Sequence, residues 1–366
     1  MKILILGNNL KSSSGWGRLS SSIVNELQKN NHEVLALTES SEAAIACEKN
    51  LLKPANSFFN ILKNIFIVRS AAKDFEIIHA LDGFPYSIYG YFAALFNKKK
   101  LFITGVGTYS VAPLQNKLKA PLLKLAYKKA KAIFCISNYT KNKILEKVNC
   151  NCVTVFMGAP EIKTQNFDLA ALKAKYKITD NYPIFLTVGA INPRKGQLDS
   201  LQAVAKLSAE YPKFKYFIIG DDSAFKDYAA EIKKYIADNN LDNNVYLLNN
   251  IKGDSKLAFF YRVCDYFIMT SVNFKNTHFE GFGLVFLEAY QFGKPAIGST
   301  DCGIEDAIVN GKTGFLTKQS DINDIYEKIK LLFKSDKVKM RQNCLDFVKQ
   351  FSWEKTIAEY LKYYKS

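Results

Sequence analysis

Short apolar runs rich in β-branched residues alternate with longer helical patterns along the whole sequence. This alternation is typical of βαβ units, in which helices join parallel strands. The expected strands lie at residues 2–6, 33–37, 76–80, 101–104, 132–136 and 153–156, and then at 184–189, 215–220, 245–248, 266–271 and 295–300. The sequence therefore predicts an α/β fold with two doubly wound, Rossmann-like sheets.

The length agrees with two domains. A chain of 366 residues is too long for one ordinary core and suits two domains of roughly 150 to 200 residues each. The sequence becomes polar and irregular after Gly158, so we place the first domain at residues 1–165 and the second at 166–350. In doubly wound folds ligands bind outside the carboxyl ends of the strands, and a cleft is expected where two such domains face each other.

Positive charge is concentrated in the first half. The net charge is +16, and residues 1–163 hold 22 Lys and Arg against 10 Asp and Glu, whereas residues 164–366 hold 28 against 24. Between residues 53 and 131 there are 13 Lys and Arg, and the only acidic residues are Asp74, Glu76 and Asp82.

The basic, amphipathic segments at 57–73 and 114–132 suit the surface of an anionic membrane. A lysine-rich solvated surface is an equally good interpretation. Nucleic acid is not an expected partner, because no RNP-type strand or recognition motif with interleaved aromatic residues is present.

The cysteines and the N-terminal residues give information on the cellular location of the protein. None of the seven cysteines belongs to a zinc-type CxxC pair, which favours reduced, mostly buried thiols in a cytosolic protein. The opening MKILILG is too short for a signal peptide and is better interpreted as a strand, and no apolar run approaches the ~18 residues of a membrane span. We expect a cytoplasmic protein that is at most peripheral on the inner face of a membrane.

Two glutamates lie in EGFGLVFLEAYQFGKP, residues 280–295. Glu280 is expected on the loop after a strand, and Glu288 within the first turns of the helix that follows. A helix N-terminus preceded by glycines suits a diphosphate, because its backbone N–H groups are unpaired and its dipole end is positive. Glu288, in a helix that is apolar on nearly every face, needs hydrogen-bond donors. The hydroxyls of a ribose would provide them, and so would a structural Lys or backbone partner.

Two further glycine-containing loops lead from a strand into a helix. In the first, from Gly189 to Gly196, Arg194 and Lys195 are candidates to clamp a pyrophosphate, although an isolated pair of loop cations is usually only solvated. The second, residues 12–18, carries Gly15 and Gly17 and is a weak signal by itself.

The E-x7-E spacing of Glu280 and Glu288 resembles that of the retaining glycosyltransferases of family 4, which have the GT-B fold. Other segments resemble the same family in the same order, among them SGWGR (14–18), ITGVGTYS (103–110), LTVGAINPRKGQ (186–197), FYRVCDYFIMTS (260–271) and GKPAIGSTDCGIEDAIVNGKTGFL (293–316). The resemblance covers essentially the whole chain. It implies a first domain that takes the acceptor, a second that binds a nucleotide-sugar donor, and a C-terminal helix at about 351–366 that crosses back to the first domain.

The resemblance also implies roles for the matching residues. Glu280 would lie against the donor sugar, and Glu288 would bind the ribose of the nucleotide. Together with Glu280, Arg194 and Lys195 would be the catalytic residues, and both cations would bind the diphosphate with the backbone at 282–284. The full donor-binding set is Gly15, Gly17, Gly189, Arg194, Lys195, Glu280, Gly281, Phe282, Gly283, Leu284 and Glu288, and the acceptor-side candidates are Thr108 and Tyr109.

Two positions depart from the pattern of the family. Members commonly have Arg where this chain has Ala190, and many have His where it has Val106. The first departure leaves Arg194 to supply the charge on the pyrophosphate, and the second removes a hydrogen bond to the sugar. His79 is expected to be a satisfied residue at a strand end, and the resemblance assigns no role to His278.

The expected reaction is sugar transfer with retention of anomeric configuration, to a glycan or lipid-linked acceptor in bacterial surface polysaccharide or lipopolysaccharide synthesis. The helix dipole, backbone N–H groups and the two cations would stabilise the leaving nucleoside diphosphate, so neither a cofactor nor a metal is expected. A sugar-nucleotide epimerase or a phosphorylase on the same fold is the alternative, and a binding-only relative is another. A dehydrogenase is disfavoured, because the first strand-turn region lacks G-x-G-x-x-G with an acidic ribose ligand.

Overall fold

The computed structural model describes residues 1–11, 15–40, 46–162, 168–179, 182–249, 251, 253–274 and 277–366. The chain divides into two compact units, the first formed by Met1–Gly158 and Phe351–Ser366 and the second by Ala159–Gln350. The domain boundary expected between residues 165 and 166 lies outside the described residues.

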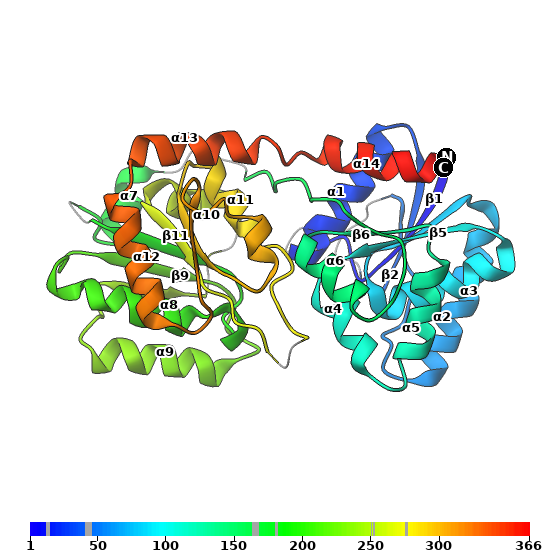
Figure 1. Ribbon diagram of the computed structural model, residues 1–366, viewed down its shortest axis with the longest axis horizontal. Helices are drawn as coiled ribbons and strands as arrows, with labels where there is room; N and C mark the ends of the chain where they lie inside the picture. Colours follow the sequence, from blue (N-terminus) through cyan, green and yellow to red (C-terminus); the bar gives the residue numbers. More distant parts are fainter. Residues whose placement is uncertain are drawn as a thin grey trace. The chain divides into compact units, whose positions relative to one another are not determined.

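The first unit is built on a seven-stranded parallel sheet with the order β3-β2-β1-β4-β5-β6-β7 (Figure 1). Its strands are β1 (Lys2–Gly7), β2 (Glu33–Thr38), β3 (Glu48–Asn50), β4 (Ile77–Ala80), β5 (Lys100–Gly105), β6 (Ala132–Cys135) and β7 (Cys152–Thr154). Its helices are α1 (Gly15–Lys29), α2 (Phe58–Ala71), α3 (Ile88–Asn97), α4 (Thr108–Val111), α5 (Ala120–Lys129), α6 (Asn138–Leu145) and α14 (Trp353–Lys365), with short turns η1 (Ala72–Asp74), η2 (Gly83–Ser87) and η3 (Ala112–Gln115). Helices cover both faces of the sheet, which is why its central strands are continuous apolar runs.

The second unit has a six-stranded parallel sheet with the order β10-β9-β8-β11-β12-β13. Its strands are β8 (Ile184–Val188), β9 (Lys215–Ile219), β10 (Val245–Leu248), β11 (Tyr266–Met269), β12 (Ala296–Ser299) and β13 (Gly314–Thr317). Its helices are α7 (Leu169–Lys175), α8 (Gln197–Ala205), α9 (Lys226–Asp238), α10 (Asp254–Val263), α11 (Leu284–Gln291), α12 (Ile322–Lys334) and α13 (Lys337–Val348), with turns η4 (Pro193–Lys195), η5 (Lys206–Ala209) and η6 (Gly303–Asp306). The two doubly wound sheets predicted from the sequence are therefore confirmed.

The last helix, α14, completes the core of the first unit, as predicted. The hydroxyl of Tyr364 is hydrogen-bonded to Nδ1 of His79 at 2.5 Å, and Nε2 of His79 to Oγ1 of Thr104 at 2.8 Å. The ring of Tyr360 stacks on Phe134 of β6, with 4.2 Å between ring centroids. Burial lowers the pKa of His79 to about 3, so this imidazole is neutral and hydrogen-bonded on both nitrogens. The prediction that His79 is a satisfied strand residue is confirmed.

Candidate active site

The candidate site of the second unit lies where the order of its strands reverses. The chain runs outward from β8 through β9 to β10, then returns to the other side of β8 as β11. In such sheets the crevice at the carboxyl ends of the two central strands is the usual ligand site. The loop after β8 carries Arg194 and Lys195, and the loop after β11 carries Glu280.

These three side chains form an ion-pair cluster. Both Nη1 of Arg194, at 3.1 Å, and Nζ of Lys195 donate to the same oxygen of Glu280, Oε2. Only 13% of the Glu280 side chain is exposed. Burial alone would raise the pKa of this carboxyl, but the charges and hydrogen bonds of Lys195 and Arg194 lower it to about 2. Glu280 is therefore ionised at any physiological pH.

Close backbone packing holds the two loops against each other. Gly196 has a φ of +63°, and a Cβ there would lie 2.0 Å from the carbonyl oxygen of Thr270, so only glycine fits. The backbone N–H of Val272 donates to the carbonyl oxygen of Arg194 at 2.8 Å. Arg194 and Lys195 are thus fixed beside the loop that carries Glu280.

The turn after Glu280 leads directly into α11. Gly283 precedes the helix with a φ of +86°, and Phe282 is buried beside it. The carbonyl oxygen of Glu280 accepts a hydrogen bond from the backbone N–H of Gly303 at 2.8 Å, and a Cβ on Gly303 would lie 1.9 Å from the carbonyl oxygen of Gly281. Gly303 was not among the predicted site residues, although it lies in the segment 293–316 that resembles the family.

Glu288 is buried in α11, with only 6% of the residue exposed. The hydroxyl of Tyr261, a fully buried residue of α10, donates to its Oε2 at 2.7 Å. The sequence left open whether a ribose, a lysine or the backbone donates to Glu288, and in the structure a tyrosine does so. Only the position of Tyr261 in a segment that resembles the family could have pointed to it.

The remaining candidates lie in the first unit. A Cβ on Gly17 would lie 2.1 Å from the carbonyl oxygen of Lys11, so its missing side chain accommodates the protein's own loop. Gly15 begins α1, and among the described residues no atom beyond its chain neighbours lies within 4 Å of the place that a Cβ would occupy. Tyr109 is 63% exposed, and its ring meets that of Trp16 edge-on at a centroid distance of 6.3 Å. Thr108 begins α4 beside it, whereas residues 12–14 lie outside the described residues.

The first unit also contains a buried carboxylate, Asp82, to which no role was predicted from the sequence. It follows β4, where the strand order of this sheet reverses. Its Oδ1 accepts hydrogen bonds from the backbone N–H of Gly83, at 2.6 Å, and from the hydroxyl of Ser110. Burial raises the pKa of this carboxyl to about 7, although those hydrogen bonds oppose the rise. Asp82 thereby ties the β4 loop to the segment that carries Thr108 and Tyr109.

The positions that depart from the family pattern have ordinary surroundings. Ala190 is exposed, and its carbonyl oxygen accepts a hydrogen bond from Nε2 of Gln197 at 2.9 Å. The backbone N–H of Val106 donates to Oγ of Ser110 at 3.0 Å. His278 is exposed, with Nδ1 2.9 Å from Oγ1 of Thr277.

Within the described ranges no three His, Cys, Asp or Glu side chains are grouped to hold a metal ion, and a metal-independent reaction stays a prediction.

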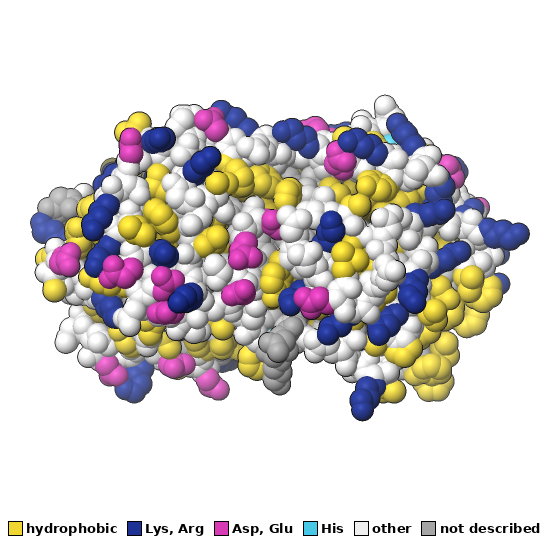
Figure 2. Space-filling view, viewed as in Figure 1, with side chains coloured by type: hydrophobic (Ala, Val, Ile, Leu, Met, Phe, Trp, Pro, Cys, Tyr) yellow, Lys and Arg dark blue, Asp and Glu magenta, His cyan; other side chains and the backbone are white. Residues whose placement is uncertain are grey.

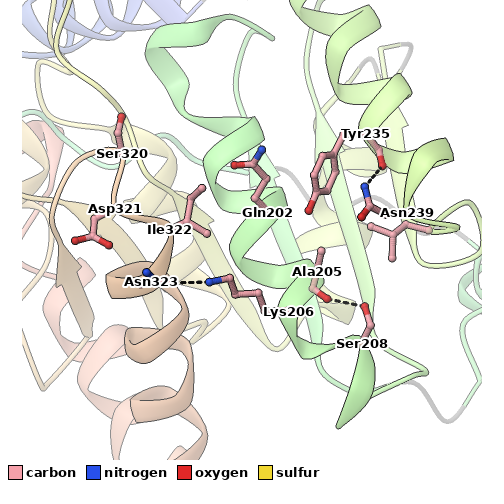
Figure 3. A pocket seen from close by; sticks show the side chains of 11 residues that line it. Gln202, Ala205, Lys206, Ser208, Tyr235, Asn239, Ser320, Asp321, Ile322 and Asn323 are labelled. Carbon is pink, nitrogen blue, oxygen red and sulfur yellow. Dashed lines mark hydrogen bonds between the residues drawn. The ribbon is translucent and has the colours of Figure 1, made fainter.

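A separate hollow of about 940 Å³ lies beside α8 and the start of α12 (Figure 3). Gln202 and Lys206 line it from one side and Asn323 from the other, and Nζ of Lys206 donates to Oδ1 of Asn323. No member of the ion-pair cluster is among its lining residues. This hollow is therefore not part of the candidate site.

The ion-pair cluster predicts a specific acid sensitivity. The folded-state pKa of Glu280, about 2, is below the ordinary value of 4.5, so its ionisation stabilises the fold above pH 4.5 and this contribution is lost as the pH falls toward 2. We expect the free energy of unfolding of the wild-type protein to fall between pH 5 and 3 by on the order of 2 kcal/mol more than that of Glu280→Gln. Urea titrations at several pH values measure this difference. Glu327→Gln, at a side chain that is 59% exposed, is the control and should match the wild type.

The sequence model described as Glycosyl transferases group 1 matches residues 169–358, more than half of the chain. Among curated proteins, an uncharacterized glycosyltransferase of Methanocaldococcus jannaschii is 27% identical over 312 residues, which cover 84% of this chain and 79% of that protein.

Solved structures agree on the fold. A glycosyltransferase of Rickettsia africae superposes with a TM-score of 0.83 at 22% identity, covering 100% of this chain and 97% of that one. The structure of Anabaena HepE in complex with UDP-glucose superposes with a TM-score of 0.79 at 19% identity, covering 99% of each chain. The predicted two-domain GT-B fold class is therefore confirmed.

Proposed function

The chain belongs to the glycosyl transferases group 1 family and is a glycosyltransferase, and we propose that it transfers a sugar from a nucleotide-sugar donor with retention of anomeric configuration. The observation that carries this proposal is the cluster of Arg194, Lys195 and Glu280 at the point where the strand order reverses. The two cations of this cluster would bind the diphosphate of the donor, and the carboxylate would accept hydrogen bonds from the hydroxyls of the sugar. The structural likeness to Anabaena HepE, solved with UDP-glucose, supports such a donor.

In the proposed reaction, the bond between the anomeric carbon and the diphosphate oxygen breaks, and negative charge develops on the leaving nucleoside diphosphate. Arg194, Lys195 and the N-terminal N–H groups of α11 would stabilise that charge as fixed, preorganised groups. The acceptor hydroxyl forms the new bond on the face that the leaving group departs from, and its proton passes to the diphosphate. Retention follows from attack on that face.

Glu280 would position the donor sugar and would not act as an acid. With a pKa of about 2, its carboxylate accepts hydrogen bonds from sugar hydroxyls and has no proton to donate at neutral pH. It also holds Arg194 and Lys195 beside the reaction centre before the donor arrives. The cluster holds two positive charges and one negative, so its net positive charge attracts the diphosphate.

Glu288 would bind the ribose. The proposed contact is a charged hydrogen bond from a ribose hydroxyl to this carboxylate, which also accepts a hydrogen bond from Tyr261. Tyr261 would hold the carboxylate in one orientation before the nucleotide arrives.

The acceptor would be a glycan or lipid-linked sugar bound by the first unit, with Thr108 and Tyr109 on its path. We place the reaction in bacterial surface polysaccharide or lipopolysaccharide synthesis, on the cytoplasmic side of the membrane. The support is chemical: the first half of the chain is strongly basic, which suits anionic lipid-linked acceptors.

A thermal-shift screen with UDP-, GDP- and ADP-sugars tests the donor proposal. A donor present at about 100 times its dissociation constant stabilises the folded state by about 2.7 kcal/mol, so one base series should raise the melting temperature by several degrees. Lys195→Ala should abolish that rise, whereas Lys233→Ala, in the exposed part of α9, should preserve it.

Product analysis with the donor so identified separates the alternatives. Free nucleoside diphosphate together with a lengthened glycan supports transfer. An epimerised sugar nucleotide, or a sugar phosphate formed with inorganic phosphate, would replace the proposal by the epimerase or phosphorylase.

A further inference from the structure

The first unit presents large apolar side chains to solvent on three helices. Of the eighteen large hydrophobic side chains that are exposed among the described residues, nine lie on or next to α2, α3 and α5. These nine are Phe58, Phe59, Leu62, Phe66, Leu95, Phe96, Leu118, Leu122 and Leu125, and we call their surface the α2–α5 face. Helix α3 packs against both α2 and α5, so the three helices form one continuous layer. Figure 2 shows hydrophobic side chains gathered at the lower right, over the α2 and α3 region of Figure 1.

Helix α2 is oriented with its aromatic side outward. Only Asn64 and Val68 of its fourteen residues are buried, whereas Phe59 is 81% exposed. The Asn64 amide donates to the carbonyl oxygen of Lys53 at 2.7 Å and to the hydroxyl of Tyr89 at 3.0 Å, and its Oδ1 accepts from the backbone N–H of Lys53 at 2.9 Å. These bonds fix the rotation of the helix. The phenylalanines of α2 therefore point to solvent because the packing of Asn64 holds the helix in this orientation.

The charges on this face have one sign. The sequence contains no Asp or Glu at residues 49–73 or 83–145, and these segments include all three helices. Lys63 on α2 and Lys124, Lys128 and Lys129 on α5 are exposed among the apolar side chains. Arg69 lies over the ring of Phe96, 4.1 Å from its centroid, which carries a cation onto the aromatic surface.

We propose that the α2–α5 face docks on the surface of a membrane that contains anionic lipids. Phenylalanine and leucine side chains enter the boundary between headgroups and acyl chains, and the lysines around them meet the phosphates. A second copy of this chain is a poorer occupant, because a symmetric contact would bring like charges together. No helix among the described ranges is long and apolar enough to span a membrane, so the contact is a surface one. The inference rests on this face and does not depend on the proposed donor chemistry.

Vesicle co-sedimentation of the full chain tests the proposal. We expect binding to vesicles of phosphatidylcholine with about one third phosphatidylglycerol and much weaker binding to phosphatidylcholine alone. The variant Lys124→Gln/Lys128→Gln/Lys129→Gln should lower the partition coefficient for the anionic vesicles by on the order of 100-fold. Phe59→Ser/Phe66→Ser should lower it at least about tenfold, because two apolar anchors are lost.

Matched controls lie on exposed positions of the second unit. Lys226→Gln/Lys233→Gln/Lys256→Gln removes the same charge, and Phe225→Ser/Val338→Ser removes comparable apolar surface. Both should bind like the wild type. Glu280→Gln should also bind normally even if turnover is lost, so a failure of docking and a failure of the proposed catalysis are distinguishable.

A second measurement does not depend on loss of binding. In Phe59→Trp the added indole should shift its emission to shorter wavelength with anionic vesicles, after subtraction of the wild-type signal from Trp16 and Trp353. Equal sedimentation with both vesicle types, unchanged binding of the face variants, or no emission shift would overturn the proposal. So would a dimer in light scattering that the Phe59→Ser/Phe66→Ser variant dissociates, since the face would then be an interface between copies.

Discussion

Replacement of Glu280 by glutamine is expected to lower the turnover number by about 100- to 1,000-fold while donor affinity changes by only a few fold. Glutamine keeps the size of the side chain but removes the charge to which Arg194 and Lys195 are paired. The sugar then loses a charged hydrogen-bond acceptor, and the two cations lose the anchor that orients them. Donor binding is largely retained, because both cations are still available to the diphosphate. Initial rates of nucleoside diphosphate release and calorimetric dissociation constants measure the two effects separately.

The matched control is Glu231→Gln, an exposed carboxylate on α9. It should leave both constants unchanged. Because Glu280 also stabilises the fold, melting temperatures must confirm that Glu280→Gln is folded at the assay temperature. A folded Glu280→Gln protein with turnover within a few fold of the wild type would remove Glu280 from the proposed reaction.

Replacement of Glu288 by glutamine should mainly weaken donor binding, whereas replacement of Glu280 should mainly lower the turnover number. We expect donor affinity to fall by about 100-fold, or roughly 2.7 kcal/mol, with much less change in turnover at saturating donor. The loss is large because the site is buried, and a ribose hydroxyl that donates to an ionised oxygen loses a charged acceptor. Calorimetric titration with the nucleoside diphosphate alone measures the effect, because the ribose contact does not require the sugar.

The variant Tyr261→Phe tests whether the Tyr261 hydroxyl orients Glu288 for the ribose or only stabilises the fold. It removes the hydroxyl that donates to Glu288 and leaves the aromatic packing against Phe292 in place. We expect a weaker nucleoside diphosphate affinity, by about tenfold, at an unchanged turnover number. If Glu288 were only a structural partner of Tyr261, both variants would lower the melting temperature and leave the affinity unchanged, which would refute the ribose role.

The strands of both sheets could be predicted from the sequence because most of them are buried on both faces and carry continuous apolar runs. The two that were missed, β3 and β13, are edge strands. β3 consists of Glu48, Lys49 and Asn50, none of which is apolar, and β13 begins with a glycine after a turn-rich segment. Hydrophobic patterning revealed the other two edge strands, β7 and β10, because each carries an apolar run, which β3 lacks and which in β13 is cut to two residues after the glycine.

The residues of the candidate site were identified more readily than their contacts. Glycine-containing loops after predicted strands led to Arg194, Lys195 and Glu280, but the sequence contains no signal that both cations would share one oxygen. Lys195 and Glu280 are 85 residues apart in the sequence, and they meet only because β8 and β11 are neighbours in the sheet. The partner of Glu288 and the outward rotation of α2 were likewise inaccessible, because each is set by side-chain packing between helices.

The position of α14 has a consequence for how the chain is made. The second unit is continuous in sequence, whereas the first needs the last sixteen residues, and Tyr360 and Tyr364 reach the strand residues Phe134 and His79 only after those residues are synthesised. On a ribosome the second unit can finish folding while the first still lacks the helix that covers His79, Thr104 and Phe134 of its sheet. The unit that is translated first is therefore completed last, and a chain that stops before residue 351 lacks the helix that completes its first unit.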